Sequence, residues 1–260
     1  MKCFFELILT FLLLCPASAL ASGFLNDTLY SAGRTVSSPA RICKDDLLLL
    51  GALAAGGLAV YSLDGQIRHA FLRSKSGLND DIAKNAEKLG NGGYDAALVA
   101  VYGGAGLLLK NERMQETSLM AAESFLAANA AGTLLKYSVG RARPYAHDGK
   151  RRFTPFRFKT ARTSFPSGHT VSAFSVASVF AARSDSPAVK GLAYSLASCV
   201  ALQRVYDDKH WASDVFAGAA LGTAVGRWVA SRKDRAGASS AMLVPVYSRD
   251  YSGAAAVFSF

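Results

Sequence analysis

Residues 204–215 read RVYDDKHWASDV and lie between two apolar segments, 191–205 and 215–230. Both segments are rich in Ala, Leu and Gly and contain few clusters of β-branched residues, which favours helices over strands. Within the stretch, Arg204, His210 and Asp214 follow one another at intervals of six and four residues. In isolation this spacing fits a solvated helix residue, a metal ligand or a catalytic histidine, and the rest of the chain decides between them.

Four further segments of the same composition precede this stretch: 47–63, 96–109, 119–135 and 170–182. Together the six segments predict an all-α protein, a helical bundle of about six core helices. The final residues, AMLVPVYSRDYSGAAAVFSF, place two apolar runs around a turn signal and predict a short C-terminal tail resembling a β-hairpin. We therefore divide the chain into residues 1–21, a lead-in segment over 22–44, a helical domain over 45–235 and a tail over 236–260.

Residues 1–21 have the pattern of a secretory signal. Lys2 is followed by the apolar run CFFELILTFLLLC and by the small residues PASALAS, which place cleavage after Ala21. Glu6 interrupts the apolar run, so an uncleaved N-terminal anchor is the alternative. We expect export in either case, and the apolar surroundings of Cys199 favour a buried, unpaired thiol.

A membrane span requires about 20 apolar residues. Only residues 47–63, between Asp46 and Asp64, approach that length without a charge. The other segments are short or are interrupted by residues such as Glu123 and Arg227. This pattern favours a compact bundle with buried Ala and Gly contacts, and an integral multi-span topology is the alternative.

The chain carries 29 Lys and Arg against 19 Asp and Glu, a net charge of +10. No aromatic platform or groove-reading helix accompanies these cations, so we expect an anionic substrate or membrane surface as the partner and no nucleic acid. Many of the cations crowd between residues 141 and 162, namely Arg141, Arg143, Lys150, Arg151, Arg152, Arg157, Lys159 and Arg162.

Residues 136–144, KYSVGRARP, form the first of three candidate motifs. On a helix, Lys136, Gly140 and Arg143 would share one face, and Pro144 would end the helix. Two cations would therefore point in one direction. Alone, such a stretch is most often a solvated helix end.

Residues 164–170, SFPSGHT, form the second motif. Pro166 and the pair Ser167-Gly168 predict a tight turn before a helix that begins near Thr170. The free N–H groups at a helix start bind anions, and His169 stands beside them.

The third motif is the opening stretch. If Asp214 lies one helical turn beyond His210, its carboxylate can accept a hydrogen bond from one ring nitrogen and leave the other unprotonated. Such a histidine is a nucleophile or base, and Arg204 supplies a planar donor fork suited to phosphate oxygens. The spacing provides no third metal ligand, so we expect neither a metal site nor a cofactor.

In this order and at these distances, the three motifs resemble those of the type 2 phosphatidic acid phosphatase family, whose site is shared with bacterial class A acid phosphatases and vanadium haloperoxidases. The resemblance covers roughly residues 45–232 and implies a metal-independent phosphatase on an all-α bundle. It implies that His210 attacks phosphorus, that Asp214 orients His210, and that His169 protonates the leaving oxygen and then activates water. The phosphate-binding residues that it implies are Lys136, Arg143, Ser167, Gly168 and Arg204. The chain departs from the family where Gln203 replaces a serine before Arg204.

The resemblance implies hydrolysis of lipid phosphates such as phosphatidate or a polyprenyl diphosphate. A soluble, periplasmic acid phosphatase acting on small phosphomonoesters is the first alternative, a haloperoxidase the second, and a non-enzymatic envelope protein the third. We expect a location on the periplasmic side of the envelope in association with the membrane. The sequence indicates no oligomeric state.

Overall fold

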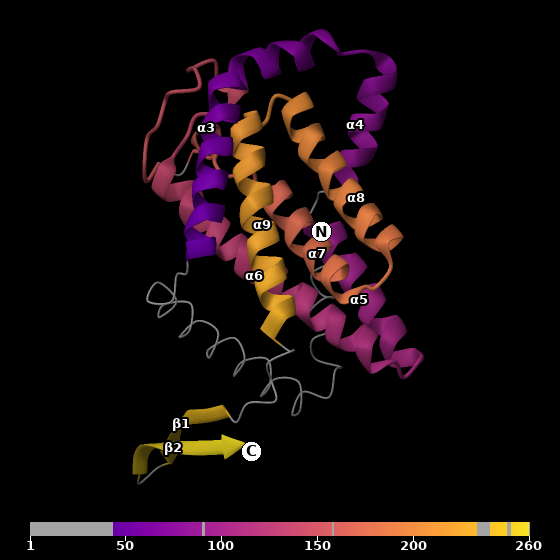
Figure 1. The fold of residues 1–260 in the computed structure, drawn as a ribbon. Coiled ribbons are helices and arrows are strands. Elements are labelled where there is room, and N and C mark those ends of the chain that lie inside the picture. The colour runs from indigo at the N-terminus through magenta and orange to yellow at the C-terminus, as the bar shows by residue number, and fades with distance from the viewer. Residues whose placement is uncertain (1–43, 90–91, 158, 233–239, 249–250, 260) are drawn as a thin grey trace. The chain divides into compact units, whose positions relative to one another are not determined.

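The computed structural model describes residues 44–89, 92–157, 159–232, 240–248 and 251–259. Seven α-helices lie in this part of the chain (Figure 1). Six of them cover the six predicted segments to within one residue, which confirms the helical bundle. The helices are α3 (Lys44–Arg73), α4 (Gly77–Leu89), α5 (Gly92–Leu108), α6 (Glu112–Val139), α7 (Gly168–Arg183), α8 (Pro187–Tyr206) and α9 (Ala212–Arg232).

Helix α4 was not predicted from the sequence. Its residues, GLNDDIAKNAEKL, are mostly polar, and its larger apolar side chains Leu78 and Ile82 are exposed. Among its described side chains, 77–87, those that it buries are the small ones of Ala83 and Ala86, and it packs mainly against α8. Because the segment is mostly polar, it lacks the Ala-, Leu- and Gly-rich composition that marked the other six segments as helices.

Helix α7 lies at the centre of the bundle and packs against α5, α6, α8 and α9 (Figure 1). The core around it is built from small side chains, whereas most large apolar side chains lie outside. Because small residues let helix backbones approach closely, the bundle is tight without a leucine core. The core residues are Val99, Ala121, Val176 and Val179 on one side of α7, and Ala173, Ala177, Ala197 and Val200 on the other.

Three glycines of α9, one helical turn apart, contact α7. A Cβ at Gly218 would lie 2.9 Å from Ser167 O, one at Gly222 2.6 Å from Val171 O, and one at Gly226 2.5 Å from Ser175 O. The two backbones are therefore in direct contact, and no side chain could be inserted without moving the helices apart. This contact fixes the starts of α7 and α9, beside which both candidate catalytic histidines lie.

Helix α6 ends at Val139, so the expectation that Arg143 lies on the same helix as Lys136 is wrong. Gly140 adopts a left-handed conformation with φ of 61°, and a Cβ there would lie 2.0 Å from Thr154 O. The chain turns at this glycine and continues as an extended segment over residues 141–143. That segment bonds to two others: Ala142 N–H donates to the carbonyl of residue 152, and Arg143 N–H donates to the carbonyl of residue 161, each over 2.9 Å.

Helix α3 is apolar and exposed along most of its length. Within the described residues it is the one helix long and apolar enough to cross a membrane: its best 18-residue window, in 47–73, has a mean hydropathy of 1.7 and is 6% buried. Asp64 is the exception, a fully buried carboxylate near the end of the apolar run. Polar contacts join α3 to the rest of the bundle: Arg68 pairs with Asp208 over 2.6 Å, and Lys150 Nζ donates to the carbonyls of Tyr61 and Ser62.

The predicted tail is an antiparallel hairpin of β1 (Ser240–Ser248) and β2 (Tyr251–Ser259), with Ser248 opposite Tyr251. The predicted signal and nearly all of the lead-in segment lie outside the described residues, and the domain boundaries stay a prediction. Cys199 on α8 is a free thiol, as expected, but it is exposed rather than buried.

Candidate active site

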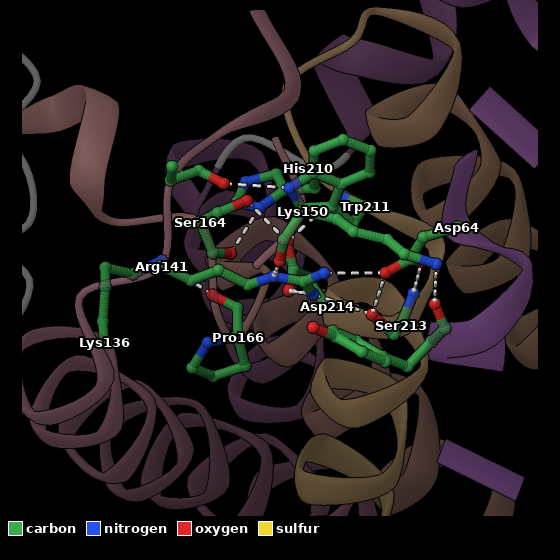
Figure 2. Close-up of polar contacts among 12 residues, drawn as sticks. Asp64, Lys136, Arg141, Lys150, Ser164, Pro166, His210, Trp211, Ser213 and Asp214 are labelled. Atoms are coloured by element: carbon green, nitrogen blue, oxygen red, sulfur yellow. Dashed lines mark hydrogen bonds and ion pairs between the residues drawn. The ribbon is translucent and has the colours of Figure 1, made fainter. Parts of the chain in front are cut away.

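The polar centre of the site is the guanidinium of Arg141, which is 1% exposed (Figure 2). It donates to two buried carboxylates, from Nη2 to Asp64 over 2.7 Å and from Nη1 to Asp214 over 2.5 Å. Nη1 also lies 2.8 Å from Ser213 Oγ, and the Tyr61 and Trp211 rings lie 4.9 and 5.5 Å from the guanidinium carbon. Burial raises the pKa of Asp214, and the charge of Arg141 opposes this rise. Arg141 therefore ties α3 to the start of α9.

The predicted hydrogen bond between His210 and Asp214 is absent, because Asp214 has other partners. Its Oδ2 accepts from Ser164 Oγ over 2.5 Å and from the Trp211 N–H over 3.0 Å, so the carboxylate caps the start of α9. His210 precedes that helix, and its Nδ1 lies 2.6 Å from the carbonyl oxygen of Ser164. Ser164 thus contacts both residues and links the carboxylate to the histidine (Figure 2).

The contact with Ser164 fixes the tautomer of His210. A carbonyl oxygen can only accept, so Nδ1 must carry the proton that it donates, and Nε2 is left with a free lone pair. His210 is buried, and burial together with the positive charges of Lys136 and Arg143 holds its pKa well below the usual range. At neutral pH the ring is therefore uncharged and has the protonation state of a nucleophile.

His169 lies in the first turn of α7, which begins at Gly168, two residues before the predicted start. Burial lowers its pKa to about 4, and the charges of Arg204, Arg143 and Lys136 act in the same direction. The same three cations also lower the pKa of His210. The structure therefore brings both histidines and all three predicted cations into one electrostatic neighbourhood, where a bound anion would favour protonation of His169.

Lys136 and Arg143 belong to different segments of the chain, but both lie beside the second motif. Lys136 Nζ donates to the carbonyls of Thr163 and Pro166 over 3.1 and 2.7 Å, and burial lowers its pKa to about 8. Arg143 Nη2 lies 3.5 Å from the same Thr163 carbonyl, and its Nε is buried with no hydrogen-bond partner among the described residues. A buried guanidinium donor without an acceptor is unusual and is suited to receive an oxyanion.

The start of α7 lies beside Lys136. An ideal Cβ on Gly168 would be 3.9 Å from Lys136 Nζ, so the predicted anion-binding backbone and the lysine face one space. The backbone N–H of Ser167 donates to the Asp214 carbonyl over 3.1 Å, and its hydroxyl accepts from Thr170 Oγ1 over 2.9 Å. Ser167 is thereby held in place, and its hydroxyl proton remains available to a ligand.

Arg204 is held by its neighbour Gln203, the position at which the chain departs from the family. Gln203 Oε1 accepts from Arg204 Nε over 2.5 Å, and its amide donates to Asp207. Arg204 Nη2 also pairs with Glu87 of α4 over 3.0 Å. The glutamine therefore orients the arginine. Glu87 accepts from Arg204 Nη2, a donor for which a bound phosphate would compete.

No cluster of three or more His, Cys, Asp or Glu side chains that could hold a metal occurs in the described parts of the chain.

Asp64, Arg141 and Ser164 were not identified from the sequence as site residues. A weak signal for Arg141 existed in its position within KYSVGRARP, but nothing in the spacing distinguished it from its neighbours. Asp64 carried no signal beyond being the first charge after the apolar run.

Comparison with known proteins supports the resemblance. Residues 118–237 match the PAP2 superfamily, and this range includes all three motifs. A lipid A 1-phosphatase of Porphyromonas gingivalis is 43% identical over 93 residues, which is 35% of this chain and 18% of that protein. A lipid A 1-phosphatase of Rhizobium johnstonii is 34% identical over 139 residues, 50% of this chain and 56% of that protein. The chain therefore spans less than two thirds of the length of these curated relatives.

The fold also matches a solved structure. The crystal structure of the first transmembrane PAP2 type phosphatidylglycerolphosphate phosphatase from Bacillus subtilis superposes with a TM-score of 0.55 at 22% identity, over 71% of this chain and 95% of that one. The match of residues 118–237 confirms the predicted resemblance, and this superposition confirms the helical-bundle fold.

Proposed function

We propose, from the PAP2 superfamily match of residues 118–237, that this chain is a metal-independent phosphatase that hydrolyses phosphate monoesters of lipids. The observation that carries the proposal is the state of His210: a buried, uncharged imidazole with a fixed Nε2 lone pair among three cations. This is the environment that in-line attack on phosphorus requires.

In the proposed reaction, His210 Nε2 attacks the phosphorus atom and the bond to the leaving oxygen breaks. His169, protonated once the phosphate dianion is bound, gives its proton to that oxygen. The N–P bond of the phosphohistidine is then broken by a water molecule whose proton His169 accepts, which releases phosphate and restores both histidines. Lys136, Arg143, Arg204, Ser167 and the Gly168 N–H stabilise the charge on the three equatorial oxygens.

Asp214 contributes through Ser164 in this scheme. The carboxylate fixes the Ser164 side chain, and the Ser164 carbonyl fixes the orientation and tautomer of His210. Asp64 and Arg141 hold Asp214 in turn. We therefore assign Asp64, Arg141, Ser164 and Asp214 as positioning residues, and His210 and His169 as catalytic residues.

A lipid substrate is favoured over a soluble one by the apolar exterior of the bundle. Large apolar side chains are exposed on several helices, which is the arrangement expected where lipid rather than water covers the surface. The relatives reported above act on lipid phosphates by name, which agrees with this choice. The exposed side chains include Leu48, Leu50, Leu58 and Leu63 on α3, Leu98, Val101 and Leu108 on α5, Leu126 and Leu134 on α6, and Leu192, Leu196 and Leu202 on α8.

The proposal is tested with the purified full chain in zwitterionic detergent. We expect phosphate release from a lipid phosphate to exceed release from a water-soluble phosphomonoester, and His210→Ala to lower turnover by about 10³-fold or more. A radiolabelled substrate should leave an acid-labile, alkali-stable phosphoprotein in the wild type and none in the variant. The exposed His69 on α3 provides the control, since His69→Ala should leave both readouts unchanged, and circular dichroism checks that His210→Ala is folded. Activity of His210→Ala near that of the control would exclude His210 as the nucleophile.

A further inference from the structure

Much of the positive charge between residues 141 and 162 is not used by the site described above. Arg152, Thr154, Arg157, Lys159 and Arg162 line a separate hollow of about 170 Å³, and no carboxylate contributes to its lining. Arg141 and Arg143 serve the active site and Lys150 bonds to α3, so the cations that line the hollow need another explanation.

These cations are poorly neutralised. Arg162 Nη1 pairs with Asp148 Oδ2 over 2.8 Å, the one ion pair that a lining residue makes among the described residues, and that nitrogen makes no well-formed hydrogen bond. For Arg152, Arg157 and Lys159, no carboxylate lies within 4 Å in the same parts of the chain. Like charges gathered around one hollow repel one another, and a bound anion would relieve the repulsion.

The hollow adjoins the segment that carries Arg143. Thr154 N–H donates to the Gly140 carbonyl over 2.8 Å, and the Ala142 and Arg143 N–H groups bond to the carbonyls of residues 152 and 161. The extended segment 141–143 therefore lies between the two stretches that line the hollow. An anion in the hollow would sit next to the segment that supplies Arg143 to the reacting phosphate.

We propose that this hollow binds a phosphate group other than the one that is hydrolysed. Guanidinium and ammonium groups match the oxygens of a phosphate by charge and hydrogen bonding. The substrate class is accordingly a lipid that carries a second phosphate, held in the hollow while the first lies against His210. This inference rests on the proposed phosphatase function, because it names the substrate of that same site.

The test compares a lipid carrying two phosphate monoesters with its one-phosphate counterpart, using the full chain in zwitterionic detergent micelles. The hollow variant is Arg157→Gln with Lys159→Gln. The control is Arg151→Gln with Lys190→Gln, which removes the same charge from two exposed positions outside the hollow. We expect the hollow variant to raise KM for the two-phosphate lipid by about tenfold, since hydrogen bonds to charged groups are the strong ones, and to change KM for the one-phosphate lipid less than about twofold.

A second arm identifies the source of the phosphate. The one-phosphate lipid is presented in vesicles of zwitterionic or of anionic phospholipid. If the hollow variant is impaired only in anionic vesicles, the hollow is a phosphate site, and its ligand is the headgroup phosphate of a neighbouring lipid. Equal effects of the hollow and control variants in every arm, or an equal loss on both lipids in zwitterionic micelles, would overturn the proposal.

Binding without turnover separates this proposal from the proposed function. Titration calorimetry with inorganic phosphate should detect at least one site in the wild type and the control that the hollow variant lacks. If the wild type binds phosphate in the hollow but hydrolyses neither lipid, the proposed phosphatase function is wrong and the hollow is still a phosphate site. If phosphate binding is identical in all three proteins, the hollow is not a phosphate site.

Discussion

Replacement of Arg141 by methionine should destabilise the protein strongly. The change removes the guanidinium but keeps a flexible side chain of similar length among the Tyr61, Phe153 and Trp211 rings. It leaves the carboxylates of Asp64 and Asp214, each 0% exposed, without their shared cation. An unpaired buried charge is among the most unfavourable changes that a single substitution can make.

The size of the effect follows from the geometry of the pair. Removing one partner of a buried ion pair costs about 3–5 kcal/mol. Arg141 serves two carboxylates at 2.7 and 2.5 Å, so we expect the upper part of that range. A domain with a free energy of unfolding of about 5–15 kcal/mol would lose a large share of it.

The loss should depend on pH. Without Arg141, the pKa of Asp214 rises further above its value of about 3.9 in the unfolded chain. The folded variant then binds more protons than the unfolded one, so its free energy of unfolding falls as pH rises above about 4, by up to about 1.4 kcal/mol per pH unit, until the folded pKa is passed. The wild type should show less of this dependence because Arg141 opposes the rise.

The measurement is equilibrium unfolding of the full chain in detergent, followed by circular dichroism at pH 5 and pH 8. Arg151→Met, at an exposed position in the same basic segment, is the control. Adding Asp64→Asn to Arg141→Met should restore part of the lost stability, because it removes one of the two unpaired charges. A loss of less than about 1 kcal/mol at both pH values would refute the assignment of Arg141 as the cation of this network.

Three further outcomes follow from the site. His169→Ala should slow hydrolysis of an alkyl phosphate by about 10²- to 10⁴-fold and that of an aryl phosphate far less, because an acidic phenol leaves without a proton; equal losses in single-turnover rates would contradict its role as the acid. The pKa of His169 lies at about 4 in the folded protein and near 6.5 in the unfolded chain, so the unfolded state binds more protons between these values and the free energy of unfolding should fall as pH drops from about 6.5 to 4. Denaturant titrations across this window should show a smaller fall in His169→Gln, and identical curves would count against the buried, uncharged ring. Dialysis against a chelator should leave the turnover rate unchanged, and a loss that magnesium or zinc restores would indicate a metal-dependent mechanism.

The helices could be predicted because the amino-acid composition of a segment largely determines whether that segment forms a helix. Segments rich in Ala, Leu and Gly formed helices at the expected places, and the hairpin followed from two apolar runs around a turn. The end of α6 was misjudged, because the spacing of Lys136, Gly140 and Arg143 fits a helix face as well as it fits a helix that stops at a glycine. The decisive contact, between Gly140 and Thr154, depends on how a later segment packs.

For the site, too, local features could be predicted from the sequence and long-range contacts could not. Residues in short motifs could be found because their spacing is local, and the structure brings Lys136, Arg143 and Arg204 around the two histidines as expected. The contacts that hold these residues in place could not be found: Arg141 meets Asp64 across 77 residues, and Ser164 meets Asp214 across 50. The direct bond between His210 and Asp214 was expected from spacing on a helix, and it is missing because α9 begins after His210.

The glycine contact between α7 and α9 has a mechanical consequence. Packed helices usually accommodate a ligand by sliding a little past one another, which requires side chains that can change rotamer at the interface. Gly218, Gly222 and Gly226 have no side chain to adjust, and their backbones rest on the carbonyls of α7. His169 at the start of α7 and His210 beside the start of α9 are therefore expected to move together as one rigid block. Any opening and closing during the proposed catalytic cycle would come from the parts around that block: α3, α4 and residues 144–163.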